Sequence, residues 1–205
     1  MIETIRSLLS FRKSQKKPET QEMIGIIGTG RSVGVTHFSI MTAGYLTGVL
    51  RRRCAVLEWN NHGDFDRMAK ICTGDSSQPN GFQILEADYY GQAGIHTLLM
   101  CKKSGFQTVI VDYGTVVEGS LDEFLRCDRQ FVLGSFSEWQ IEAFLEFERT
   151  GRSMGRSWET FISFGSEETR KNIEKRLNCQ IRRIPVSVDA FAVTEELFGF
   201  YQKLF

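Results

Sequence analysis

The strongest chemical signal in the sequence is a glycine-rich turn between an apolar run at 23–28 and a segment with helical apolar spacing from Phe38 onward. Three glycines stand there within seven residues: Gly28, Gly30 and Gly34. Glycine permits positive φ and a close approach of a ligand to the backbone, and the N–H groups at a helix N-terminus attract phosphate. The turn therefore predicts a phosphate- or anion-binding loop. The alternative is a tight strand-to-helix turn that binds nothing.

One motif interpretation of this loop is a dinucleotide fingerprint. Its glycines read G-x-G-x-x-x-G, one residue longer than the usual spacing, and Glu58 ends the second apolar run, where an acid that binds ribose is expected. This interpretation predicts a Rossmann-type oxidoreductase. It is weakened because the chain has no room for a separate catalytic domain beyond the sheet.

The competing interpretation is a P-loop that binds ATP or ADP. Gly34, Val35 and Thr36 align with the G-K-[ST] end of a Walker A motif, and Asp112 ends an apolar run as a Walker B acid does. A hydroxyl and a carboxylate so placed suit hydrated Mg²⁺, so Thr36 and Asp112 are the predicted metal site. The predicted nucleotide contacts are Gly30, Arg31, Ser32, Val33, Gly34, Val35, Thr36 and His37.

The elements that position these residues alternate regularly. Short apolar runs predict strands at 23–28, 54–58, 82–86, 107–112, 130–134, 159–164 and 180–184. Amphipathic spacing predicts helices at about 36–52, 93–104, 119–127, 137–151, 167–177 and 193–204. Several of the strand runs lack alternation, as strands buried on both faces of a parallel sheet do. The sequence thus predicts a doubly wound, mostly parallel, three-layer αβα domain of about seven strands over residues 23–205, with ligands at the carboxyl ends of the strands.

Composition places the chain among ordinary globular proteins. Of 205 residues, 41% are hydrophobic, and 25 Lys and Arg balance 25 Asp and Glu. This balance argues against attraction of the whole surface to nucleic acid or anionic membrane. The five cysteines include no CxxC pair, which argues against a disulfide framework or structural zinc and favours a reducing cytosol. No apolar run approaches the roughly 20 residues of a spanning helix, and no signal-peptide pattern is present.

Residues 1–22 differ from the rest of the chain by their basic character. Their cations are Arg6, Arg12, Lys13, Lys16 and Lys17, and the apolar residues at helical spacing are Ile2, Ile5, Leu8 and Leu9. The pattern predicts a short amphipathic helix. The segment is either a frayed lead-in to the first strand or a surface anchor for a membrane or a partner.

Other notable side chains near the expected ligand face are His37, His62, Trp59 and Trp139. The histidines show no ligand spacing, so a metal site built on them is not expected. We expect His37 to be a packing residue and His62 to belong to a solvated loop. The two tryptophans are expected to pack into the core.

The order and spacing of these motifs resemble the ParA/MinD branch of P-loop ATPases over about residues 23–205. The segment GIIGTGRSVGVTHFSIMTAGYL resembles its deviant Walker A loop, VLEWNNHGDF the acid-bearing strand end that follows, and FQTVIVDYG its Walker B strand. Two later segments, CDRQFVLGSFSEW and IRRIPVSVDAF, resemble the next strand with its nucleotide-flanking turn and the Pro-containing loop beside the adenine pocket. Pilus-localising TadZ/CpaE-type members, which tolerate worn Walker motifs, are the most similar in character.

Departures from the family pattern bear on catalysis. The family loop reads roughly G-K-G-G-x-G-K-[ST], and the resemblance places Gly30 at the lysine that reaches a dimer partner's nucleotide and Val35 at the lysine that neutralises the β- and γ-phosphates. Asn60 and Asp112 stand at family catalytic and Walker B positions, but an amide cannot act as a carboxylate base. Arg31 is a candidate substitute cation.

The resemblance implies a degenerate family member that acts as a cytoplasmic scaffold for localisation or assembly, with weak or no ATP hydrolysis. Its expected partners are proteins of a positioning, secretion or pilus system. Any homodimer is expected to be constitutive, contact with the inner face of the membrane to be peripheral at most, and no specific nucleic acid is predicted. The alternative is an active ATP-dependent positioning ATPase of the same type.

Overall fold

The computed structural model describes residues 21–74, 81–116, 121–153, 155 and 158–205. The predictions made for residues 1–20 lie outside this part of the chain. The first described strand begins at Glu22.

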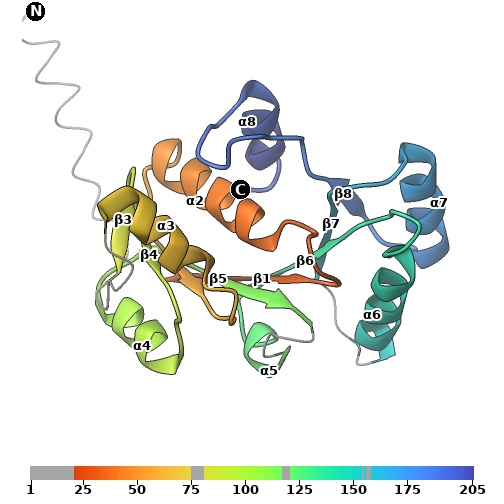
Figure 1. Ribbon diagram of the computed structural model, residues 1–205. Helices are drawn as coiled ribbons and strands as arrows, with labels where there is room; N and C mark the ends of the chain where they lie inside the picture. Colours follow the sequence, from red (N-terminus) through yellow and green to blue (C-terminus); the bar gives the residue numbers. More distant parts are fainter. Residues whose placement is uncertain (1–20, 75–80, 117–120, 154, 156–157) are drawn as a thin grey trace, which may run out of the picture.

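The described residues form one mixed sheet of eight strands, in the order β3-β4-β2-β5-β1-β6-β7-β8 (Figure 1). The strands are β1 (Glu22–Gly28), β2 (Cys54–Glu58), β3 (Phe82–Ile84), β4 (Ala87–Tyr90), β5 (Thr108–Thr115), β6 (Arg129–Gly134), β7 (Glu159–Ile162) and β8 (Ile181–Arg183). The helices are α2 (Val35–Gly48), α3 (Asp64–Thr73), α4 (Ile95–Lys103), α5 (Leu121–Phe124), α6 (Ile141–Ser153), α7 (Glu167–Leu177) and α8 (Glu195–Gln202).

Helices cover both faces of this sheet, which confirms the predicted α/β, three-layer architecture. Alternate residues of β1 point to opposite faces, as the two-residue period of a strand requires. Ile24 and Ile26 pack in the cluster that includes α2 and α8, whereas Met23 and Ile27 pack in the cluster that includes α4 and α5. Figure 1 shows α2, α3 and α8 on one side of the sheet and α4 and α5 on the other.

All strand pairs are parallel except β3 with β4, which form an antiparallel hairpin at one edge. The parallel strands therefore end at one edge of the sheet. Glu58 at the end of β2 pairs in register with Asp112 of β5, and Asp112 pairs with Ile26 of β1. The register of the sheet thus places Glu58 and Asp112, the two acids singled out by the sequence, next to each other.

Two elements, β4 and α3, were not predicted from the sequence. The run at 82–86 was expected to be one strand, but it ends at Ile84 and the chain turns back through Leu85 into β4. Leu85 has a positive φ of 54°, which a leucine rarely adopts, so no Gly or Asn marks the turn. The α3 helix buries only Phe65 and Ala69, so its apolar periodicity is short.

Aromatic packing joins α8 to α2 over the centre of the sheet. Tyr201 of α8 stacks on Tyr45 with ring centroids 5.1 Å apart, and its hydroxyl lies 3.0 Å from the Thr42 hydroxyl. Phe38, in the first part of α2, packs 5.2 Å from Phe161 of β7. The start of α2, where the glycine loop joins it, is therefore held against a rigid aromatic core.

We predict that Tyr201→Ala lowers the free energy of unfolding by about 3–5 kcal/mol, because it removes a fully buried ring and a buried hydrogen bond. Phe198→Ala is the matched control on the same helix, because that ring is 41% exposed, and it should cost about 1 kcal/mol or less. Urea denaturation measures both. Equal losses for the two variants would show that α8 is not anchored through Tyr201.

Candidate functional site

The glycine loop is a tight turn that leaves a helix N-terminus open. Ser32 and Gly34 have positive φ angles of 59° and 90°. Gly28 lies so close under the returning loop that a Cβ there would stand 2.7 Å from Val33. Gly34 has no side chain to cap α2, so the first-turn N–H groups of that helix are left for solvent or a ligand. The loop thus has the backbone geometry of an anion cradle.

Hydrogen bonds tether the loop to β6 and the segment that follows it. The Thr29 N–H donates to the Leu133 carbonyl of β6 at 2.8 Å. The Gln140 side chain, from the turn before α6, donates through Nε2 to the Arg31 carbonyl at 2.7 Å. Both contacts lie within the protein and hold the loop against β6 and the turn before α6.

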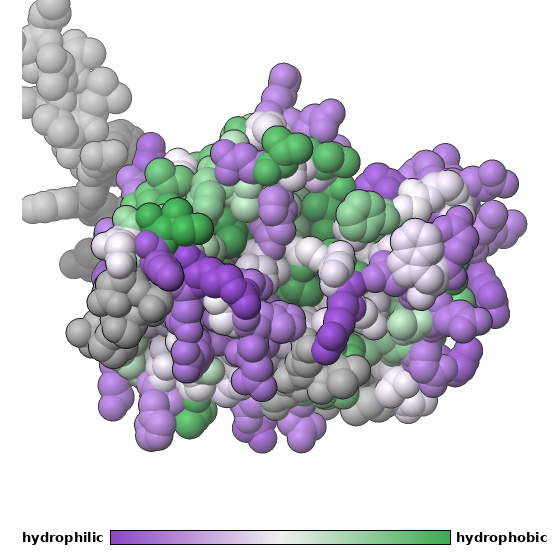
Figure 2. Space-filling model, in the orientation of Figure 1, coloured by the Kyte–Doolittle hydropathy of each residue, from purple (hydrophilic) through white to green (hydrophobic). Residues whose placement is uncertain are grey.

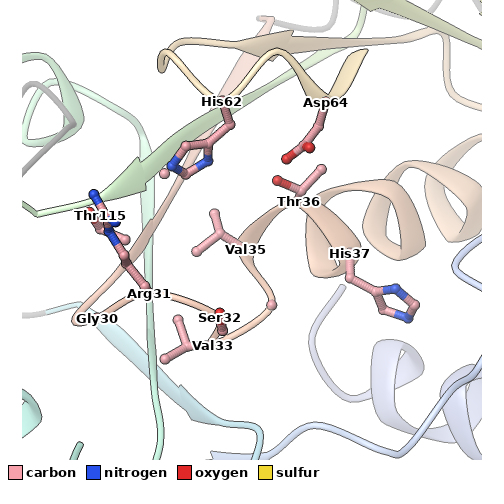
Figure 3. A pocket seen from close by; sticks show the side chains of 12 residues that line it. Gly30, Arg31, Ser32, Val33, Val35, Thr36, His37, His62, Asp64 and Thr115 are labelled. Carbon is pink, nitrogen blue, oxygen red and sulfur yellow. The ribbon is translucent and has the colours of Figure 1, made fainter. Parts of the chain in front are cut away.

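A cavity of about 480 Å³ opens over this loop (Figure 3). Its lining includes all eight residues predicted to contact a nucleotide, together with side chains or backbone from the ends of β2 and β5. These residues are Gly30, Arg31, Ser32, Val33, Gly34, Val35, Thr36, His37, His62, Asp64, Gly114 and Thr115. The sequence therefore located the cavity, while nucleotide binding by these residues stays a prediction.

Val35 places an apolar side chain in the cavity. It is 7% exposed, and Figure 3 shows its methyl groups amid the labelled side chains. The Arg31 guanidinium lies beside Thr115, and the His37 ring points away from the centre of the cavity (Figure 3). Arg31 is the one Lys or Arg among the described residues that line the cavity.

Asp112 is a completely buried carboxylate beneath this cavity. Its Oδ1 accepts hydrogen bonds from Asn60 Nδ2 at 3.1 Å and from the Gly114 N–H at 2.9 Å. Its Oδ2 is buried and has no hydrogen-bond partner among the described residues. A buried carboxylate oxygen left without a donor is a place that a hydrated cation suits.

Burial raises the pKa of Asp112 to about 6, and the nearby Thr36 hydroxyl and Gly114 N–H lower it. The Thr36 hydroxyl is close enough to act on the carboxylate but does not complete a hydrogen bond to Oδ2. A metal ion between these two groups would fit the donors present, and metal binding by Thr36 and Asp112 stays a prediction. Among the described residues, no group of three or more His, Cys, Asp or Glu side chains forms a metal site.

Asn60, just after β2, forms hydrogen bonds that connect it to β5, which is a structural role and not that of a base. Its Nδ2 donates to the Asp112 backbone carbonyl as well as to the carboxylate, each at 3.1 Å, and its Oδ1 accepts from the His62 N–H at 2.9 Å. The side chain is 8% exposed. A carboxylate in this position would stand against Asp112 and raise its pKa further, so the amide is what the buried acid requires.

Glu58 is turned away from any ligand. It is fully buried, and its two carboxylate oxygens accept from the Asp64 N–H at 2.6 Å and the Phe65 N–H at 3.4 Å. It therefore closes the N-terminus of α3, where a negative charge is favourable, while burial raises its pKa. An acid engaged in this way is unavailable to a ribose, which counts against the dinucleotide interpretation.

Four residues of the cavity lining lie outside the predicted nucleotide contacts: Gly114 and Thr115 of β5, and His62 and Asp64 from the segment after β2. Asp64 begins α3, and Figure 3 shows its carboxylate facing the Thr36 hydroxyl. His62 was expected in a solvated loop, but it is half-buried and lines the cavity beside Gly114. The signal that could have found His62 and Asp64 was the position of 60–64 directly after β2, at the ligand edge of the sheet.

A second, apolar cavity of about 260 Å³ adjoins the first across the glycine loop. It shares Ser32, Val33, Gly34 and His37 with the first cavity, and Phe38, Met41, Ser163, Phe164, Ile184, Pro185, Val186 and Ser187 complete it. His37 Nε2 is buried and has no hydrogen-bond partner among the described residues. A polar cavity beside an apolar one matches a ligand with a charged end and a flat apolar end.

Solved structures with this fold are MinD and ParA ATPases. The MinD cell division protein of Aquifex aeolicus is 14% identical, with a TM-score of 0.57 over 82% of this chain and 83% of that chain. A plasmid partition protein of Borrelia burgdorferi, bound to AMPPNP, is 12% identical, with a TM-score of 0.62 over 90% and 96% of the two chains. The MinC:MinD complex of A. aeolicus gives a TM-score of 0.61 at 14% identity, over 82% of each chain.

Identities this low establish the fold alone, which is the P-loop NTPase-like fold predicted from the motifs. The sequence matches no family model, and no curated protein matches it by sequence. Among the described residues, no helix is both long and apolar enough to cross a membrane.

We predict that Asp112→Asn stabilises the protein at pH 7, by on the order of 1–3 kcal/mol, because it removes the cost of a buried charge. The folded-state pKa of Asp112 is raised to about 6. Because folding raises this pKa, protonated Asp112 makes its full contribution to the free energy of unfolding below the unfolded-state pKa of about 4. That contribution is lost as the pH rises through the folded-state pKa.

The stability difference between the variant and the wild type should therefore grow from about pH 4 to pH 6 and then level off. Denaturant titrations at each pH measure it. A difference that stays constant across this range would contradict a buried, titrating Asp112.

Proposed function

We propose that this protein is a degenerate member of the ParA/MinD type that serves as a localisation or assembly scaffold and hydrolyses ATP weakly or not at all. The observation that carries the proposal is Val35, an apolar side chain in the cavity at the position where the family pattern has its phosphate-binding lysine. A MinD cell division protein and a plasmid partition protein have the same fold.

The charges around the cavity support weak catalysis. The described lining holds one Arg, Arg31, and one carboxylate, Asp64, and Asp112 is buried nearby, so the lining supplies no net excess of fixed positive charge for a triphosphate. Loss of one charge-assisted hydrogen bond to phosphate costs roughly 1.5–3 kcal/mol. Hydrolysis should suffer more than binding, because phosphoryl transfer depends on cations that stabilise the charge of the transition state.

The same lining supports residual binding of ATP or ADP with Mg²⁺. The open N–H groups of α2 suit phosphate oxygens, and Thr36 with the unpartnered Oδ2 of Asp112 would hold the hydrated metal. When bound, Mg²⁺ neutralises phosphate charge. The adjoining apolar cavity, with Pro185 and Phe164, suits a planar base.

The tethers around the cavity support a role that does not depend on turnover. Asn60 donates a hydrogen bond to Asp112, Glu58 accepts one from the backbone at the N-terminus of α3, and Gln140 donates one to the Arg31 carbonyl. All three contacts lie within the protein. A site held this firmly has less to gain by rearranging around a nucleotide. We infer that the protein binds its partners in one constitutive conformation.

Exposed apolar side chains near the cavity provide a surface for such partners. Trp139, Phe164, Val186 and Val188 are 81%, 58%, 83% and 100% exposed, and they lie on the loops after β6, β7 and β8. We call these four residues the apolar rim. Trp139 was expected to pack into the core, and this prediction was wrong because the side chain is exposed. Figure 2 shows hydrophobic side chains gathered over α8 and the segment that joins β8 to it.

The partners proposed are a second copy of this chain and proteins of a positioning, secretion or pilus system, with membrane contact at most peripheral. The MinC:MinD complex supports partner binding by this fold, because that neighbour is a protein complex. The second candidate function is an active positioning ATPase, which the retained Thr36 and Asp112 and the candidate cation Arg31 favour.

We predict that Val35→Lys binds Mg–ADP at least about 10-fold more tightly than the wild type, because it adds a charge-assisted bond to phosphate. Val35→Met is the matched control, since it has similar length and no charge. Isothermal titration calorimetry measures both variants. If Val35→Lys binds no better than Val35→Met, the cavity does not receive phosphate at this position.

We also predict an oligomer whose mass is the same with and without ATP and Mg²⁺, and which dissociates in the double variant Trp139→Ser, Val186→Ser. Size-exclusion chromatography with light scattering measures the mass. Ile71→Ser is the control, because Ile71 is 85% exposed near the C-terminal end of α3. A wild-type monomer that dimerises only with ATP would favour the working switch instead.

A further inference from the structure

An apolar stripe is exposed on α4, on the face of the sheet opposite α2. The helix buries Leu98 and Cys101 against the sheet, but Ile95, Leu99 and Met100 are 49%, 48% and 41% exposed. A surface helix normally carries polar residues on its outer side, and apolar residues on both sides are typical of a helix that is covered on both sides. The described residues do not cover this outer stripe.

The N-terminal segment enters the domain at the end of the same helix. The Gln21 side chain donates to the Cys101 carbonyl at 3.1 Å and to the Phe106 carbonyl at 2.9 Å. Cys101 lies in the last turn of α4, and its carbonyl also accepts from the Ser104 N–H, so Gln21 adds a second donor at the helix C-terminus. Gln21, the first described residue, is therefore held at the C-terminal end of α4.

We propose that residues 2–12 of this chain bind the α4 stripe as a short amphipathic helix, with Ile2, Ile5, Leu8 and Leu9 against Ile95, Leu99 and Met100. The apolar spacing of the segment gives a helix of about 16 Å, and α4 is about 13 Å long, at 1.5 Å per residue. Residues 13–20 span up to about 26 Å when extended, which is enough to reach any point of α4.

The charges on α4 and α5 are compatible with the charges of the N-terminal segment in this arrangement. Lys102 and Lys103 at the end of α4 repel the basic residues Lys13, Lys16 and Lys17, which keeps the connecting stretch away from that end of the helix. The α5 helix, which covers the same face of the sheet, carries the exposed Asp122 in its first turn as an acidic partner for Arg6, whereas Glu123 pairs with Arg126 (Figure 1). The contact is marginal for an isolated helix and depends on burial against α4.

Binding of this segment to α4 can be measured independently of any nucleotide. Hydrogen exchange with mass spectrometry is compared between the full chain and a variant that lacks residues 2–20. We expect the backbone amides of α4 to exchange at least about 5-fold faster in the shortened protein, because the helix loses its cover. Exchange in β1 and β5 is the control for an intact fold and should not change.

A second pair of variants separates the apolar contact from charge effects. In the full chain, Leu8→Asp should reproduce the faster exchange of α4, whereas Arg12→Asp, which leaves the apolar face intact, should not. Conversely, Leu99→Ser should increase tryptic cleavage after Lys13 and Lys16, and Ile71→Ser should leave it unchanged.

Equal exchange of α4 in the full and shortened chains would overturn the proposal. Vesicle flotation gives a second outcome that would overturn it. If the full chain floats with vesicles of anionic lipid, and flotation requires residues 2–12 but is unchanged by Leu99→Ser, the segment serves as a membrane anchor instead. Loss of the oligomer on shortening, with α4 exchange unchanged, would likewise assign the segment to a second copy of the chain instead.

Discussion

Burial of the Asp112 carboxylate in the middle of the sheet is the constraint on which the site depends. A charge without water must be supplied with donors, and it receives them from Asn60 and from the Gly114 backbone. Asn60 can reach it because β2 and β5 are paired in register, which places Glu58 opposite Asp112. The Thr36 hydroxyl at the start of α2 is close enough to lower the pKa of the same carboxyl.

The rest of the fold keeps this arrangement rigid. Phe38 lies two residues beyond Thr36 and packs against Phe161, and Tyr201 closes the aromatic layer over α2. The position of the glycine loop is thereby set by the hydrophobic core as well as by the bonds from Leu133 and Gln140. The glycine loop is thus supported from both sides by contacts within the protein, and this support motivates the proposal of a scaffold in place of a switch.

Much of the fold could be predicted because parallel strands leave a strong sequence signal. The run ending at Gly28 and the one ending at Asp112 are continuous apolar strands, and both lie at the sheet centre. The hairpin was missed because Leu85 makes the turn at a positive φ without glycine. The α3 helix was missed because its N-terminus is closed by Glu58, a residue six positions earlier that no local pattern connects to it.

The candidate site was predicted only in part, because some of its residues are contiguous in sequence and others are not. Loop residues contiguous in sequence, from Gly30 to His37, were found, whereas His62 and Asp64 come from a loop whose position depends on the unpredicted α3. The structural role of Asn60 could not be predicted from the sequence. The sequence shows only that a family carboxylate is replaced by an amide, whereas the structure shows that this amide donates a hydrogen bond to the buried Asp112.

The central claim is that the cavity retains the form of a nucleotide site but lacks its catalytic charge. The most direct test is phosphate release from ATP with Mg²⁺ by the purified wild type, beside Thr36→Ala and Asp112→Ala. The account predicts a wild-type rate indistinguishable from those of the two variants. Wild-type turnover comparable with that of ordinary ParA-type enzymes, abolished by either substitution, would contradict it and establish an active ATPase.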